Sequence, residues 1–170
     1  FFVGNHDLWM KDYLEEEIGI PVFFEKQYYE ISGKNFLLAH GDGLGPGDKG
    51  YKRMKKLFTN PIAQWFFKWL HPDIAMKIAV YFSTKNKMIS GVEDMKFLGE
   101  DKEFLILYSK EKLKSEKIDY FVYGHRHLPM ILDLKIDENA ANYVNLGDWI
   151  SYFTYGVFDG AEFKIEEYKQ

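Results

Sequence analysis

The sequence predicts an α/β layered β-sandwich with flanking helices, formed by a single domain over residues 1–170. Two buried strands support this fold class, because residues 36–39 and Tyr120–Tyr123 are apolar on both faces and each run ends at a glycine-flanked histidine. An amphipathic helix over residues 102–117 and a meander of short strands from Met130 onward indicate sheet layers rather than a helical bundle. The hydrophobic content of 46% is sufficient for one core.

The N-terminal part of the chain is predicted to begin inside the fold. Residues 1–3, Phe-Phe-Val, read as the end of a buried strand that runs directly into a polar loop, without an initiator methionine. We therefore expect N-terminal strands to be missing, with a natural or tag-cleaved N-terminus as the alternative. Residues 8–18 have helical spacing, and residues 22–24 and 28–31 are predicted to form short strands.

A helical insertion is predicted over about residues 49–90, with a lid over about residues 51–87. Apolar residues follow a helical pattern from Tyr51 to Phe82, and prolines at positions 61 and 72 break it into two or three short helices. Aromatic side chains are dense in its middle part. No stretch of the chain approaches the roughly 20 apolar residues that span a bilayer.

The charge of the chain is distributed unevenly, although the net charge is only −4. Residues 49–87 contain nine basic residues and one acid, which gives +8 and leaves −12 on the remainder. Dense aromatics combined with this positive charge favour a lid that faces an amphiphilic anion, or a patch on an anionic membrane surface. A structural helical hairpin with a solvated basic face is the alternative. The acidic remainder argues against nucleic-acid binding.

Four of the five histidines follow strongly apolar, strand-like runs in glycine-containing loops: His6, His40, His125 and His127. Ligand sites in layered α/β proteins gather at the carboxyl ends of strands, so these loops are expected to converge on one pocket. His71 lies in a Leu-His-Pro break and is interpreted as a surface residue.

The donor atoms in these loops predict a site for two metal ions. One ion is expected to be bound by Asn5, His40 and His125, and the other by His127. Two ions about 4 Å apart activate water for attack on a phosphoryl group. The chain contains no cysteine, which excludes thiolate ligands and favours manganese or magnesium.

Carboxylates are too few near these donors to balance two divalent cations. We interpret Asp7 as the group that orients His6, and Asp42 as support for His40. The missing carboxylates, at least one of them bridging, are expected upstream of Phe1.

The three motifs, Gly4-Asn5-His6-Asp7, His40-Gly41-Asp42 and Gly124-His125-Arg126-His127, together resemble those of the calcineurin-like metallophosphoesterase superfamily. The resemblance implies that Asn5, His40 and His125 bind the second metal and that His127 binds the first. It also implies that His6 stabilises the transition state or protonates the leaving group. The Asp-x-His and Gly-Asp-x-x-Asp motifs of the superfamily are absent here, so we expect this fragment to be inactive without them.

A narrower resemblance covers nearly the whole chain. His40-Gly41-Asp42-Gly43-Leu44, the basic and aromatic helical insertion and the polar segment at residues 83–87 resemble the UDP-2,3-diacylglucosamine diphosphatases of lipid A biosynthesis. This implies a metal-dependent diphosphatase that uses two ions, usually Mn²⁺, and forms UMP and 2,3-diacylglucosamine 1-phosphate. A Gram-negative bacterial protein in the cytoplasm, peripheral on the inner membrane, is then expected. Ser83, Lys85 and Asn86 are our candidates for substrate contacts.

One position departs from that family, because well-known proteobacterial members resemble Gly-Asn-Arg-Asp where this chain has His6. An imidazolium also stabilises negative charge and donates a proton, so the catalytic interpretation holds. Two alternatives stay open: a nucleotide or dinucleoside polyphosphate phosphatase on the same scaffold, and a noncatalytic membrane-binding scaffold with structural metal.

Overall fold

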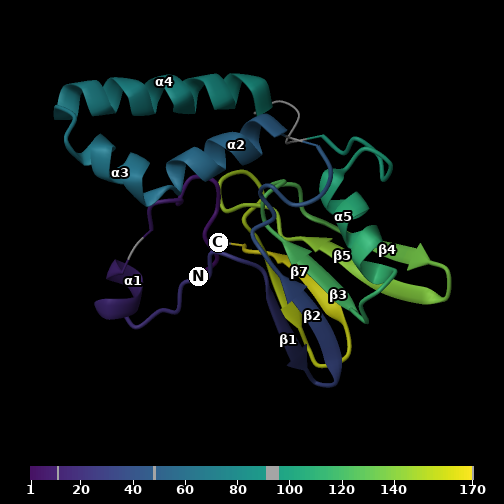
Figure 1. Ribbon diagram of the computed structural model, residues 1–170. Coiled ribbons are helices and arrows are strands. Elements are labelled where there is room, and N and C mark those ends of the chain that lie inside the picture. Colours follow the sequence, from purple (N-terminus) through teal and green to yellow (C-terminus); the bar gives the residue numbers. More distant parts are fainter. Residues whose placement is uncertain (11, 48, 91–95, 170) are drawn as a thin grey trace.

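The computed structural model of the protein describes residues 1–10, 12–47, 49–90 and 96–169, without the side chains of residues 83 and 85–90. Figure 1 shows a central sheet with its covering layers and, apart from it, a group of three helices. Along the chain the elements are α1 (Tyr13–Glu16), β1 (Gln27–Ile31), β2 (Lys34–Leu38), α2 (Lys49–Phe58), α3 (Pro61–Lys68), α4 (Pro72–Ser90), α5 (Phe104–Leu113), β3 (Tyr120–Tyr123), β4 (Met130–Ile136), β5 (Asn139–Asn145), β6 (Thr154–Phe158) and β7 (Phe163–Glu167).

The main sheet is mixed, with the strand order β1-β2-β3-β5-β4. Its three inner strands are parallel: Leu38 at the end of β2 is paired with Val122 of β3, and Tyr123 at the end of β3 is paired with Asn145 of β5. The outer strands β1 and β4 are antiparallel to their neighbours. The carboxyl ends of β2, β3 and β5 therefore meet at one edge of the sheet, as the α/β fold class predicts.

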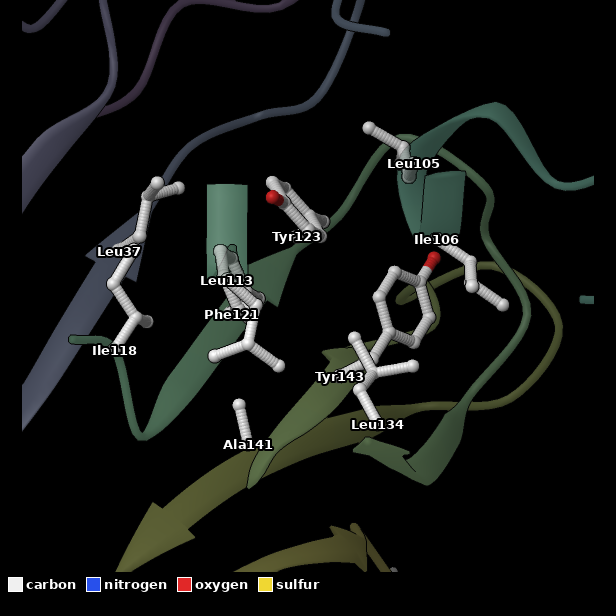
Figure 2. Close-up of a cluster of buried hydrophobic side chains, with 10 residues drawn as sticks. All are labelled: Leu37, Leu105, Ile106, Leu113, Ile118, Phe121, Tyr123, Leu134, Ala141 and Tyr143. Carbon is white, nitrogen blue, oxygen red and sulfur yellow. The ribbon is translucent and has the colours of Figure 1, made fainter. Parts of the chain in front are cut away.

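Both faces of the sheet are covered, which explains why β3 and the second half of β2 are apolar on both faces. On one face, α5 packs against a cluster that includes Leu37, Phe121 and Tyr143, and Figure 2 shows the ten side chains of this cluster. On the other face, the hairpin β6-β7 covers Phe36 and Val144 together with Tyr120 and Val122. Successive residues alternate between the two clusters because strand side chains point to opposite faces. The layered sandwich is confirmed.

Three helices occupy the predicted insertion, and both predicted breaks are confirmed. The break at residue 60 has a clear cause, since Asn60 Oδ1 accepts hydrogen bonds from the backbone N–H groups of Ile62 (2.9 Å) and Ala63 (3.1 Å) and Pro61 begins α3. The second break precedes Pro72, where α4 begins. No helix within the described ranges combines the length and the apolar character that a membrane crossing requires.

Several short predicted elements differ from the structure. The helix predicted over residues 8–18 is reduced to the four residues of α1, because Trp9 instead donates a hydrogen bond from Nε1 to the carbonyl of Phe58 (2.7 Å) at the end of α2. The strand predicted at residues 22–24 is a single parallel bridge between Phe2 and Phe23. These segments are set by tertiary partners rather than by local pattern.

The strand β6 begins at Thr154, after a turn that the side chain of Asp148 holds. The carboxylate of Asp148 accepts backbone N–H groups of residues 150, 151 and 152, at 2.9, 2.6 and 3.2 Å, and holds them in a turn. Local side-chain capping of this kind competes with strand pairing.

Candidate metal centre

The candidate site forms where the parallel strands β2 and β3 end side by side. His40 follows β2 and His125 follows β3, and the two loops are joined because the carbonyl of His40 accepts the N–H groups of Gly124 (3.1 Å) and His125 (2.9 Å). The backbone thus brings together two histidines that are 85 residues apart in the sequence. The predicted convergence of these loops is present in the structure.

Three predicted donors meet in this site, where His40 contacts both of the others. His40 Nε2 is 3.2 Å from Asn5 Oδ1 and 3.3 Å from His125 Nδ1. The two imidazole rings meet edge to face, at 70° with ring centroids 5.2 Å apart. Asn5 arrives from the loop after the Phe2 bridge, so three separate segments of the chain supply one donor each.

Glycines allow this close approach at two positions. A Cβ atom on Gly4 would lie 2.8 Å from Cε1 and Nε2 of His40, which no real side chain allows. Gly41 has a φ of 115°, and a Cβ there would also crowd the side chains of Leu105 and His125. The glycines of the first two motifs therefore make room for the imidazoles.

The three donors fit a metal ion by their chemistry and spacing. Metal–ligand bonds of about 2.1 Å place neighbouring donor atoms of one ion about 3.0 to 3.4 Å apart, and the separations around His40 Nε2 lie within this range. Among the described residues, no group of three or more His, Cys, Asp or Glu side chains is arranged to hold a metal. The third donor is the amide of Asn5, and carboxylate ligands would have to come from elsewhere.

Burial keeps both histidines of this site neutral. Desolvation lowers the pKa of His40, and it lowers the pKa of His125 to about 4, with His40 as the next contributor. An uncharged imidazole is the form that binds a metal ion, so neither ring has to lose a proton at neutral pH.

His127 lies near this cluster but has a different partner. Its Nδ1 is 3.5 Å from Oδ2 of Asp148, and its side chain is 44% exposed. A positive charge on His127 lowers the pKa values of His40 and His125, which places it within electrostatic reach of both. Its position beside the three-donor cluster, rather than within it, is compatible with the second predicted ion.

Asp42 serves a purpose that the sequence did not reveal. Its buried carboxylate accepts hydrogen bonds from Tyr51 Oη (2.5 Å) and Lys55 Nζ (2.7 Å), both on α2. Burial raises the pKa of Asp42, but the hydrogen bonds from Lys55 and Tyr51 outweigh this effect and leave the pKa below its usual value. Asp42 acts on His40 only through its charge and fastens the first lid helix to the site. The spacing of Tyr51 and Lys55 by four residues was the available signal.

Where the structure describes side chains, no hydrogen bond joins the remaining predicted site residues to the cluster of Asn5, His40 and His125. His6 is exposed on the loop next to Asn5, and Asp7 is half-buried within electrostatic reach of His40. No hydrogen bond joins His6 to Asp7 in the part of the chain that the structure describes. Ser83, Lys85 and Asn86 fall within α4, and their side chains lie outside the described residues.

No protein-family profile matches the chain. Curated proteins do match it. The chain is 36% identical over 98% of its length to a UDP-2,3-diacylglucosamine hydrolase of Porphyromonas gingivalis, and covers 67% of that protein. It is 26% identical over 88% of its length to proteins of the same name from Yersinia pestis and Yersinia pseudotuberculosis, of which it spans 60%.

We expect Gly4→Ala to displace the His40 ring, because the added methyl group would overlap it. The affinity of the full-length protein for Mn²⁺ should fall at least about 10-fold, as misplaced ligands do in other metal sites. Isothermal titration measures the affinity, and the ring resonances of His40 report its displacement. Gly50→Ala is the control, since no atom lies within 4 Å of a Cβ there. Unchanged Mn²⁺ binding in Gly4→Ala would contradict the predicted role of His40.

The lowered pKa of His125 predicts acid sensitivity of the metal-free protein. Below pH 6.5 the unfolded chain binds a proton that the partly buried His125 of the folded protein does not bind until about pH 4, so stability falls as pH decreases across this window. His125 should contribute about 2 kcal/mol of lost stability between pH 8 and pH 5. Urea unfolding and an NMR titration of the His125 ring measure the effect; a ring midpoint near 6.5 would argue against the buried, neutral state.

Proposed function

The chain belongs to the UDP-2,3-diacylglucosamine hydrolase family, and we propose that it is the part of a diphosphatase that carries most of the second metal site. The reaction is hydrolysis of the diphosphate bond of UDP-2,3-diacylglucosamine to UMP and 2,3-diacylglucosamine 1-phosphate. The observation that carries the proposal is the contact of His40, at the end of β2, with Asn5 and with His125, at the end of β3. The chain supplies these donors in the family's expected positions.

Asn5, His40 and His125 would hold one divalent ion, and His127 would contribute to the other. Two such ions, most simply Mn²⁺ given the oxygen and nitrogen donors, supply an activated water and neutralise charge on the phosphoryl group. The upstream Asp-x-His and Gly-Asp-x-x-Asp motifs would provide the carboxylates that this chain lacks.

His6 would act on the reacting phosphate. Its exposed side chain directly follows the predicted metal ligand Asn5 in the sequence, which supports this role. An imidazolium there offsets developing negative charge or donates a proton to the leaving group.

The lid helices have the surface that an acylated nucleotide sugar requires. Many of their large apolar side chains are exposed; they are Leu57, Ile62, Trp65, Phe66, Trp69, Leu70, Ile74, Met76, Val80, Tyr81 and Phe82. Monomeric soluble proteins rarely expose so large an apolar surface without a binding role. Acyl chains would pack on these side chains, and Ser83, Lys85 and Asn86 would contact the sugar and diphosphate.

The same surface supports a peripheral position on the inner membrane of a Gram-negative cell, on the cytoplasmic side. The lid segment carries a net charge of +8 beside its exposed aromatics. Apolar contact with the acyl layer and attraction to anionic headgroups act together on such a surface. A lipid substrate would then reach the site without leaving the membrane, and nucleic acid is not a partner.

We expect His127→Ala in the full-length protein to lower turnover of UDP-2,3-diacylglucosamine by at least about 100-fold, because loss of outer partners alone costs 10- to 100-fold. His71→Ala, an exposed substitution at the α3–α4 break, is the matched control and should keep wild-type turnover. Near wild-type activity of His127→Ala with added Mn²⁺ would remove His127 from the site. Faster cleavage of soluble nucleotides or dinucleoside polyphosphates than of the lipid substrate would favour the alternative function, a nucleotide or dinucleoside polyphosphate phosphatase.

The double variant Ile62→Ser, Trp69→Ser should bind vesicles with 30% phosphatidylglycerol about 10-fold more weakly than the wild type, since both side chains are mostly exposed on the lid. Co-sedimentation measures the partitioning. Ile18→Ser, exposed to a similar degree outside the lid, is the control and should bind as the wild type does. Equal binding by the double variant would show that the lid does not rest on the membrane.

A further inference from the structure

Arg126, between the two histidines of the Gly-His-x-His turn, is buried with an acidic partner. Its side chain is 6% exposed and that of Glu103 is 3% exposed. Arg126 Nε lies 3.0 Å from Glu103 Oε2, and Arg126 Nη2 donates to Glu103 Oε1 at 3.0 Å. The guanidinium therefore contacts both carboxylate oxygens, through one hydrogen bond from Nη2 and one ion-pair contact of Nε that lacks hydrogen-bond geometry.

This pair joins three parts of the molecule. Glu103 is the residue that precedes α5, and its Oε1 also accepts the backbone N–H of Leu98 at 3.1 Å. Arg126 Nη2 donates to the carbonyl of Lys96 at 2.8 Å. The turn with the histidines is thus tied both to the start of α5 and to the segment that returns from the lid.

The start of α5 shapes the histidine turn over consecutive residues. Glu103 holds Arg126, and the next residue, Phe104, packs edge to face against the His125 ring with centroids 5.9 Å apart. Leu105 follows and lies against Gly41 in the His40 loop. The start of α5 therefore contacts both the His40 loop and the His125 loop.

The backbone of the turn needs such support. His127 has a φ of 54°, a conformation that residues other than glycine rarely adopt and keep only when their surroundings hold it. A buried ion pair is weak evidence for stability, since apolar side chains of similar volume serve the core equally well. Here the pair fixes the orientation of Arg126, which immediately precedes His127 with its unusual φ.

We propose that Glu103 and Arg126 form a positioning pair that aims His125 and His127 at the two metal ions. The pair touches neither substrate nor ions and acts through the backbone of the turn. This inference rests on the proposed metal-dependent function. Through Lys96 and Leu98 it also links the exit of the lid to the metal centre.

Arg126→Met with Glu103→Leu tests the pair in the full-length protein, because the apolar replacement keeps the core filled without leaving a buried charge. We expect this double variant to fold with a wild-type circular dichroism spectrum and to bind Mn²⁺ 10- to 100-fold more weakly by isothermal titration. Arg126→Lys keeps the charge but loses the two-point contact, and it should lose most of the same affinity. At saturating Mn²⁺, kcat should fall while KM stays within about twofold, since positioning alters the reacting groups and not substrate binding.

Asp119→Asn is the matched control. Asp119 pairs with Lys34 at 3.3 Å, at the opposite end of β2 and β3, so its loss should lower stability and leave Mn²⁺ affinity unchanged. Wild-type Mn²⁺ affinity in the folded double variant would overturn the inference and leave the pair a purely structural one. Mn²⁺ affinity is measured without substrate, so a protein that binds Mn²⁺ as expected but does not cleave UDP-2,3-diacylglucosamine refutes the proposed function alone.

Discussion

The parallel pairing of β2 with β3 is the constraint on which the rest of this structure depends. It places Leu38 beside Val122 and then lets the carbonyl of His40 accept both N–H groups that follow β3. Parallel neighbours end at the same edge, so any residues that follow them are forced together. The imidazoles meet because of backbone hydrogen bonds, and their own contact is a consequence rather than the cause.

The helical insertion is attached to this edge of the sheet through α2. Tyr51 and Lys55 of α2 bind the buried carboxylate of Asp42, two residues after His40. Trp9, three residues after His6, binds the end of α2 and packs on Phe67 of α3 with ring centroids 4.9 Å apart. The helices α2 and α3 are therefore held by two loops that also carry predicted site residues.

The sheet also explains how a polar site exists beside an apolar core. The inner strands lie between α5 and the β6-β7 hairpin, and the predicted ligands His40 and His125 follow the ends of β2 and β3. Desolvation by this core keeps the histidines neutral, because burial disfavours an imidazolium. Burial in this part of the fold therefore both stabilises the core and keeps the two imidazoles uncharged.

The strands, the breaks of the lid and the histidine loops were predictable from the sequence, because period-two burial, prolines and strand-to-glycine boundaries are local signals. The motifs predicted that Asn5 and His40 lie close together, but they did not predict the distance between them. Other features depended on partners far along the chain: Asp42 on α2, Arg126 on Glu103, and the short α1 on the hydrogen bond of Trp9 to Phe58. The residues next to a carboxylate or guanidinium in the sequence do not identify its distant partner. A long-range ion pair or hydrogen bond forms only after the strands have paired and the helices have packed.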